Sequence, residues 1–157
     1  MPAHAENHTA SLGTVLIREI ATSDAQPAAQ LSEELGYPVS IDEMKDRIAV
    51  IHALPDRAIF VACVDEAVIG WIDIAITCHL ATGRHAEICG FVISHAYRSQ
   101  GVGCKLLAYA ERWVAARGIA RIVVRSRTTR ESAHRFYLRE RYTRTKTSAV
   151  FSKELNT

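Results

Sequence analysis

Residues that could hold a phosphate group lie together at positions 98–103, where the chain reads Arg-Ser-Gln-Gly-Val-Gly. The run follows an apolar stretch at 87–93, which is typical of a buried strand, and precedes apolar positions 106, 107, 110, 113 and 114, spaced as one face of a helix. A glycine-bearing turn at a helix start points backbone N–H groups outward at the positive end of the helix dipole, where anions bind. We therefore expect a phosphorylated ligand to dock near residues 98–105.

Three glycine-rich motifs compete for this turn. A P-loop requires Gly-Lys and then Ser or Thr, but Gly103 is followed by cysteine, lysine and leucine. The dinucleotide fingerprint requires a third glycine where Leu106 stands. The pattern Arg/Gln-x-x-Gly-x-Gly/Ala is matched completely by Arg98, Gly101 and Gly103. The remaining alternative is a turn that merely starts a helix.

Length and composition favour one globular domain. The chain has 157 residues, of which 48% are hydrophobic, and this is enough for a single sizeable core. No apolar run approaches the roughly 20 residues of a membrane span. We expect residues 1–13, which are polar, to form a disordered tail, and residues 14–157 to form a single domain.

The cysteine pattern favours a reducing compartment, and the histidine pattern gives no indication of a structural metal site. The four cysteines have no Cys-x-x-Cys spacing, and the seven histidines are scattered along the chain. A cytoplasmic location is therefore expected rather than a disulfide framework, and no metal site is expected.

Charge is divided unevenly between the two halves of the chain. Residues 1–80 carry twelve acidic and four basic side chains, a balance of −8, whereas residues 81–157 carry five acidic and fifteen basic ones, a balance of +10. A basic half suits a polyanionic ligand, and an acidic half suits a cationic partner.

The order of the expected elements predicts a mixed α/β sheet. Capping boxes are expected at Ser23 with Gln26, at Ser40 with Glu43, and at Thr128 with Glu131. Hairpins combined with strand–helix–strand units indicate a mostly antiparallel sheet of six to seven strands flanked by about four helices. The expected strands are 15–20, 58–64, 68–76, 87–93, 119–125, 142–145 and 149–152, and the expected helices are 23–35, 40–54, 101–117 and 131–140.

This order and two motifs resemble the GNAT superfamily of N-acetyltransferases. The turn at 98–103 is similar to the acetyl-coenzyme A pyrophosphate loop of that family. The run Ala-His-Arg-Phe-Tyr at 133–137, followed by Arg141 and Tyr142, resembles the family's Ala-x-x-Phe-Tyr near the chain end. Two positions depart from the family pattern: Arg130 stands where Asn is frequent, and Arg141 stands where Gly is usual.

The resemblance implies a GNAT-like fold and acetyl-CoA as co-substrate. Turn amides would contact the pyrophosphate, the Arg98 guanidinium would add a charge-assisted contact, and strand backbone would serve the pantetheine and the thioester carbonyl. The implied cofactor-binding residues are Phe91, Val92, Ile93, Arg98, Ser99, Gln100, Gly101, Val102, Gly103, Cys104, Lys105, Arg130 and Phe136.

Two side chains are predicted to move protons. Tyr137, with a phenol whose reference pKa is near 10, is the candidate general acid for the departing thiolate. Glu87, fourteen residues before Gly101, is the candidate general base, because a primary amine is protonated at neutral pH and must lose a proton before it attacks. The alternatives are a tyrosine that only packs in the core and a strand glutamate without a catalytic role.

The acceptor is predicted to be a primary amine on a cationic small molecule or peptide. In the family the first two helices wall the acceptor site, and here they are acidic. A coenzyme A-binding module without catalysis is the alternative, and a nucleic-acid binder ranks below both, since no such motif appears. No membrane partner is expected, and a homodimer is possible. The acidic positions are Glu33, Glu34, Asp42, Glu43 and Asp46.

Overall fold

The computed structural model describes residues 12–156, which fall into two compact units, 12–124 and 125–156. Residues 1–11 of the expected disordered tail lie outside the described part of the chain.

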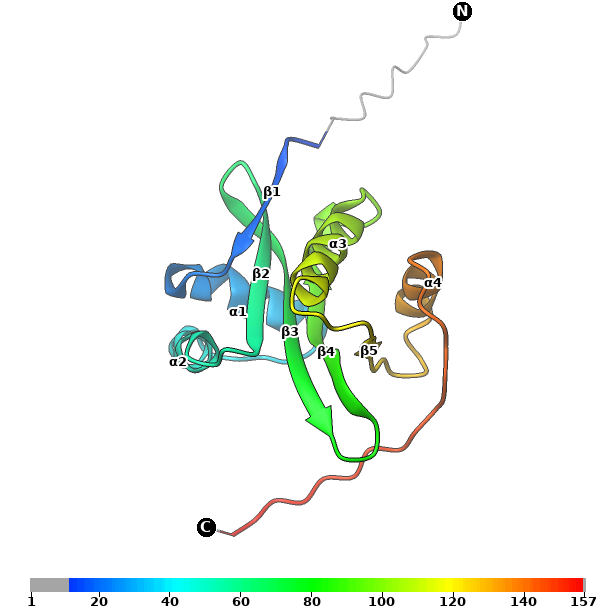
Figure 1. The fold of residues 1–157 in the computed structure, drawn as a ribbon. Coiled ribbons are helices and arrows are strands. Elements are labelled where there is room, and N and C mark those ends of the chain that lie inside the picture. Colours follow the sequence, from blue (N-terminus) through cyan, green and yellow to red (C-terminus); the bar gives the residue numbers. More distant parts are fainter. Residues whose placement is uncertain (1–11, 157) are drawn as a thin grey trace, which may run out of the picture. The chain divides into compact units, whose positions relative to one another are not determined.

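Five strands form one sheet in the order β1-β2-β3-β4-β5 (Figure 1). Neighbouring strands are antiparallel except β4 and β5, which are parallel. The prediction of a mixed, mostly antiparallel sheet is confirmed, but the expected six to seven strands are wrong. The strands are β1 (Val15–Glu19), β2 (Arg57–Val64), β3 (Ala67–His79), β4 (Gly83–Ile93) and β5 (Ile122–Val124).

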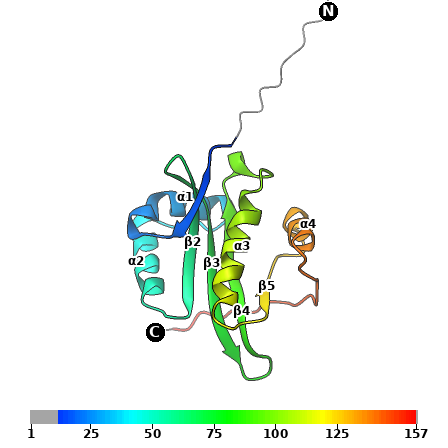
Figure 2. The same cartoon turned by 45° about the horizontal axis from the view of Figure 1, so that its top comes forward.

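Helices cover both faces of the sheet, as Figures 1 and 2 show. Because side chains alternate along a strand, β2 serves both layers. Its residues Ile59, Val61 and Cys63 join the buried cluster with the first two helices, whereas the Phe60 ring lies 4.9 Å from the Tyr109 ring on the third. The helices of this unit are α1 (Ala25–Leu35), α2 (Ile41–His52) and α3 (Val102–Ala115), with short 3-10 turns η1 (Thr22–Asp24) and η2 (His95–Tyr97).

Local capping explains where the first helices begin and end. Ser40 caps α2 by accepting a hydrogen bond from the Glu43 amide at 3.1 Å, which is one half of the predicted box, while the Glu43 carboxylate pairs with Arg47. Gly36, with φ of +101°, ends α1 in the left-handed conformation. The box predicted at Ser23 and Gln26 is wrong, because Asp24 instead closes η1 through the Ala21 amide at 2.7 Å.

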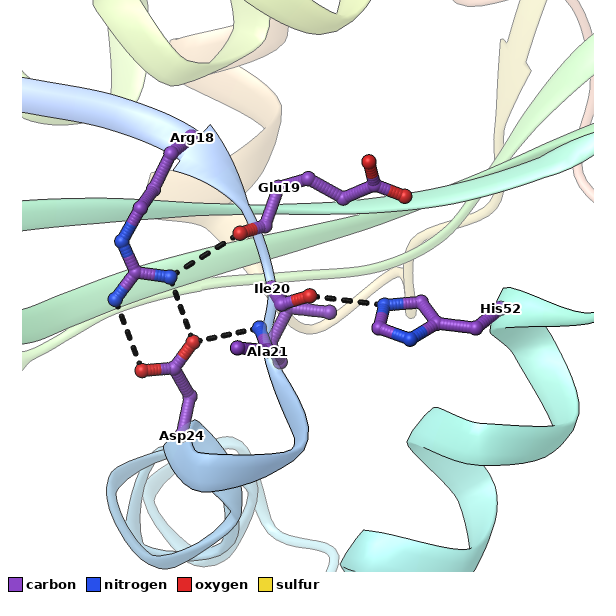
Figure 3. A network of polar contacts seen from close by, with 6 residues as sticks. All are labelled: Arg18, Glu19, Ile20, Ala21, Asp24 and His52. Atoms are coloured by element: carbon purple, nitrogen blue, oxygen red, sulfur yellow. Dashed lines mark hydrogen bonds and ion pairs between the residues drawn. The ribbon is translucent and has the colours of Figure 1, made fainter.

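Asp24 is the centre of a polar network that joins β1, η1 and α2 (Figure 3). Its carboxylate accepts two hydrogen bonds from the Arg18 guanidinium, at 2.7 and 2.9 Å. Nearby, the Nε2 atom of His52 lies 2.8 Å from the Ile20 carbonyl oxygen. The Arg18 hydrogen bonds hold the pKa of Asp24 below its usual value, although burial acts in the opposite direction.

We expect Asp24→Asn to lower the free energy of unfolding by about 1–3 kcal/mol at neutral pH. Arg18 is 39% exposed, which keeps the effect below that of a fully buried pair. Because the folded-state pKa is depressed, the stabilisation exists above the unfolded-state pKa and disappears as pH falls through the folded-state value. In urea denaturation, the difference in free energy of unfolding between Asp24→Asn and the wild type should shrink below about pH 4. The exposed control Asp46→Asn should stay within about 0.5 kcal/mol at every pH.

Residues 125–157 contain one regular element in their described part, α4 (Glu131–Arg139). The strands expected at 142–145 and 149–152 are wrong, since residues 143–156 are exposed and without strand assignment. A strand requires a partner for its backbone groups, and this unit offers none among residues 125–156. The capping box predicted at Thr128 is also wrong, because the N-cap is Arg130 and makes no side-chain cap bond.

Candidate active site

The turn between β4 and α3 has the backbone of an anion-binding loop. Ser99 and Gly101 both adopt left-handed conformations, with φ of +59° and +81°. Gly101 is the N-cap of the 14-residue helix α3, and it has no side chain that could cap the first-turn amides. These amides therefore point out of the helix start, at the positive end of its dipole. The position of the turn at the carboxyl end of β4 is as predicted.

Side chains hold the turn against the end of β4. The Arg98 Nε–H donates to the Ile93 carbonyl oxygen at 3.1 Å, and the Gln100 amide donates to the Ala96 carbonyl oxygen at 3.2 Å. Val102 is 1% exposed, so its side chain belongs to the core and only its backbone faces the turn. Lys105 and Cys104 are exposed on the first turn of the helix. The predicted binding residues of this segment are therefore brought together on one turn.

The edge of β4 next to β5 is open over its second half. β5 pairs with β4 only at Ala86, Glu87 and Ile88, and no other strand within residues 12–124 lies beside the rest of that edge. The Ser94 amide donates to Ile69 of β3 at 2.7 Å. Successive residues of a strand direct their N–H groups to opposite edges. The amides of Ile93 and Phe91 therefore point away from β3. The predicted residues 91–93 thus lie on the part of β4 that extends past β5 and leads to the turn.

A β-bulge marks the point where β4 leaves β5. The register with β3 shifts between Asp73 and Ile74, and Cys89 is the extra residue on β4. Gly90 follows it because a Cβ there would lie 2.7 Å from the Trp71 ring. That ring is fixed from the other side, since its Nε1 donates to the Ala28 carbonyl oxygen of α1 at 3.2 Å. Bulges are frequent next to active sites, where they redirect a strand.

Glu87 lies inside the sheet, with Ala75 of β3 and Val123 of β5 on either side. Its register places the side chain on the same face as Trp71, which packs against the α1 and α2 cluster. The side chain is 20% exposed, and its Oε1 lies 3.0 Å from the Nε2 atom of His85. The carboxylate is therefore held on the face of the sheet that the acidic helices cover.

Two histidines beside Glu87 escaped the sequence analysis. His85 is 2% exposed, and the Nε2 atom of His79 lies 3.7 Å from the same Glu87 oxygen. The two histidines come from different strands of one hairpin, so only the strand register brings them together. The one available signal was the His-x-Glu alternation at 85 and 87, which puts both side chains on one face of a strand.

The acidic side chains of α1 and α2 do not form a uniform wall. Glu34 accepts a hydrogen bond from the His95 amide at 3.0 Å and so connects α1 to η2. Glu43 pairs with Arg47 along α2. Glu33, Asp42 and Asp46 are exposed on the same two helices. The charge available to a cationic acceptor is therefore smaller than the sequence count.

The second unit carries the other predicted site residues. Tyr137 lies on α4 with its ring centroid 5.4 Å from that of Phe136 and 5.6 Å from that of Tyr142. Burial raises the pKa of Tyr137 to about 12, although the positive charge of Arg130 acts to lower it. The phenol therefore stays protonated at neutral pH.

Comparisons with known proteins agree with this geometry. A family model described as "Acetyltransferase (GNAT) family" matches residues 14–141. Similar solved structures include a transcriptional regulator from Bacillus halodurans C-125, with 22% identity, a TM-score of 0.80, and coverage of 89% of this chain and 100% of the other. No curated protein sequence matches the chain significantly.

Two aminoglycoside acetyltransferases share the fold at low identity. AAC(6')-Iy, solved with a coenzyme A bisubstrate analogue, is 18% identical with a TM-score of 0.81, and AAC(6')-Ih from Acinetobacter baumannii is 17% identical with a TM-score of 0.78. Each alignment covers 91% of this chain and 100% of the other. No helix in residues 12–156 is long and apolar enough to cross a bilayer. The chain belongs to the GNAT family of acetyltransferases, whose members use acetyl-CoA.

Proposed function

We propose that this protein transfers the acetyl group of acetyl-CoA directly to the primary amine of a cationic small molecule or peptide. The observation that carries the proposal is the part of β4 that extends past β5, which runs from the residue after Ile88 to the anion-binding turn and begins next to Glu87. From Glu87 to Ile93 the strand advances by six residue steps, or roughly 20 Å. A donor anchored at the turn can therefore place its thioester beside the carboxylate by lying extended along that part of the strand.

The residues divide the chemistry between them. The amides at the start of α3, together with Arg98, hold the diphosphate, and Lys105 adds positive charge there. The backbone of residues 91–93 binds the pantetheine, and an amide aimed at the thioester carbonyl stabilises the negative charge that develops on its oxygen. Glu87 takes the proton of the attacking amine, and Tyr137 donates to the departing sulfur. Arg130, at the N-cap of α4, and Phe136 are further residues that we assign to donor binding.

A steady-state assay of thiol release from acetyl-CoA tests the proposal against the alternative of a non-catalytic coenzyme A-binding module. The acceptor panel should hold polyamines, aminoglycosides, amino acids and lysine-containing peptides. Two of the structures that share this fold are aminoglycoside acetyltransferases, which supports including that class. Amine-dependent thiol release supports the enzyme, whereas donor binding without release from any acceptor supports the module.

Gly101→Ala is expected to raise the KM for acetyl-CoA by up to about tenfold. The added Cβ meets open space, so the cost comes from holding a non-glycine residue at φ of +81°, about 1–2 kcal/mol. Gly118→Ala is a matched control, because Gly118 follows the other end of α3 with φ of +72° and equally open space. Both variants should lose similar stability in thermal unfolding, but only Gly101→Ala should change the KM for the donor. Equal KM values for acetyl-CoA in the two variants would contradict a role of this turn in donor binding.

Glu33→Gln is expected to raise the KM for a cationic acceptor about two- to fivefold at low salt, with little effect on a neutral amine. Glu33 is the better position to change, since Glu34 also supports η2 beside the donor turn. The effect should fade at high ionic strength, where exposed charges are screened. Glu66→Gln, on the β2–β3 turn, removes the same charge elsewhere and should leave both constants unchanged. Identical kinetics for the two variants would contradict an acidic acceptor site.

A further inference from the structure

The β3–β4 hairpin gathers three potential metal ligands: His79, His85 and Glu87. Their nearest ligand atoms all lie within 4.8 Å of one another. The Glu87 Oε1 atom is 3.0 Å from His85 Nε2 and 3.7 Å from His79 Nε2. The rings of the two histidines meet edge to face, with centroids 4.8 Å apart. The cluster thus combines two nitrogen donors and one carboxylate.

The His85 ring is oriented as a metal-binding imidazole. Its Nδ1 lies 3.0 Å from the Gly83 carbonyl oxygen, which can only accept a hydrogen bond, so Nδ1 carries the proton. The Nε2 atom of the same ring points toward Glu87 Oε1 at 3.0 Å, and His79 Nε2 lies 3.7 Å from that oxygen. A histidine whose second nitrogen is bonded to a carbonyl is the usual arrangement around a bound metal.

The geometry points to a divalent transition-metal site, with zinc as the chemical class of ion it fits best. Zinc takes imidazole nitrogen and carboxylate oxygen at about 2.0–2.2 Å, and two histidines with one glutamate leave a fourth position for water. Donor atoms around a tetrahedral zinc ion lie about 3.3 Å apart, so the His79 nitrogen must move inward, whereas His85 Nε2 and Glu87 Oε1, at 3.0 Å, must separate slightly. His79 can make this movement, since its side chain is 46% exposed, and it also gives the ion a route from solvent.

The metal site includes Glu87. A carboxylate that is bound to a metal ion cannot act at the same time as the base that accepts the proton of the amine. This consequence for turnover depends on the proposed function, but the binding of the metal does not. Metal binding is therefore measured without acetyl-CoA or an acceptor, on the full chain stripped of metal by a chelator. A failure of acetyl transfer then leaves the metal result standing, and the reverse is also true.

Isothermal titration calorimetry with Zn²⁺ and the visible absorption of added Co²⁺ are the measurements. We expect one ion per chain and a cobalt spectrum without a thiolate charge-transfer band. His79→Ala should weaken zinc binding by more than about 100-fold, which is beyond the 10–100-fold cost of losing an outer partner. Because His79 is half-exposed, this variant should fold, whereas a change at the buried His85 risks the core. Glu87→Gln should weaken binding as well.

Two controls keep the result specific. Cys78→Ser alters an exposed thiol next to His79 in the chain but on the other face of β3, and His134→Gln removes a histidine on α4. Both should bind zinc like the wild type. The proposal is overturned if the wild type binds no zinc, if His79→Ala binds as tightly as the wild type, or if Cys78→Ser abolishes binding.

Discussion

Replacing Glu87 with Gln is expected to lower kcat for acetyl transfer by about 100- to 10,000-fold. An alkyl amine with a pKa near 10.4 is almost entirely protonated at neutral pH, and removing its proton costs about 4–5 kcal/mol. A carboxylate in the sheet between the donor edge and the acidic helices can accept that proton, directly or through water. Glutamine keeps the shape of the side chain and removes the basicity.

The loss should shrink as pH rises. Near pH 10 a large fraction of the amine is already deprotonated, so the enzyme gains less from a base. The ratio of wild-type to variant rates should therefore fall between pH 7 and about 10. The charge-matched control Glu66→Gln should follow the wild type at every pH. A constant ratio, or an unchanged kcat at pH 7, would contradict the base role.

Replacing Tyr137 with Phe is expected to lower kcat by a similar 100- to 10,000-fold, with little change in the KM for acetyl-CoA. The hydroxyl is lost while the ring, which packs against Phe136 and Tyr142, is kept. Thiol-release kinetics measure the effect. Tyr142→Phe is the matched control in the same unit, and it should cost less than about threefold in rate.

The raised pKa of Tyr137 sets the sign of its pH dependence. At a pKa of about 12 the phenol keeps its proton through neutral and moderately alkaline solution, so its own titration should not reduce the rate below about pH 11. An alkaline limb near pH 9 that Tyr137→Phe abolishes would contradict this assignment.

The elements around the donor turn could be predicted because their signals are local. Apolar spacing defines β4 and α3, and Gly101 lies where the backbone needs a positive φ. The strands expected at 142–145 and 149–152 do not form in the described residues, since a strand depends on a partner that the sequence pattern does not supply. Ser23 does not cap the helix, because the Asp24 carboxylate accepts the hydrogen bond of the Ala21 amide instead. The same carboxylate is held in place by Arg18.

The individual segments of the candidate site could be predicted from the sequence, but the strand pairing that brings their side chains together could not. The turn motif identifies residues 98–105 as a unit, and the structure brings them onto one helix start. The partners of Glu87 depend on the pairing of β3 with β4, because His79 and His85 meet only in that register. The bulge at Cys89 is likewise a property of two strands together, so a single strand's alternation gives no sign of it.

The half of β4 that β5 leaves uncovered has a consequence for handling the protein. A row of backbone amides and carbonyls without a neighbouring strand is a template on which another polypeptide can add, and proteins usually protect such rows against self-association. Acetyl-CoA bound along this part of β4, as proposed, would cover these backbone groups. Preparations stripped of it are accordingly the ones in which precipitation or chain-to-chain sheet growth should begin first.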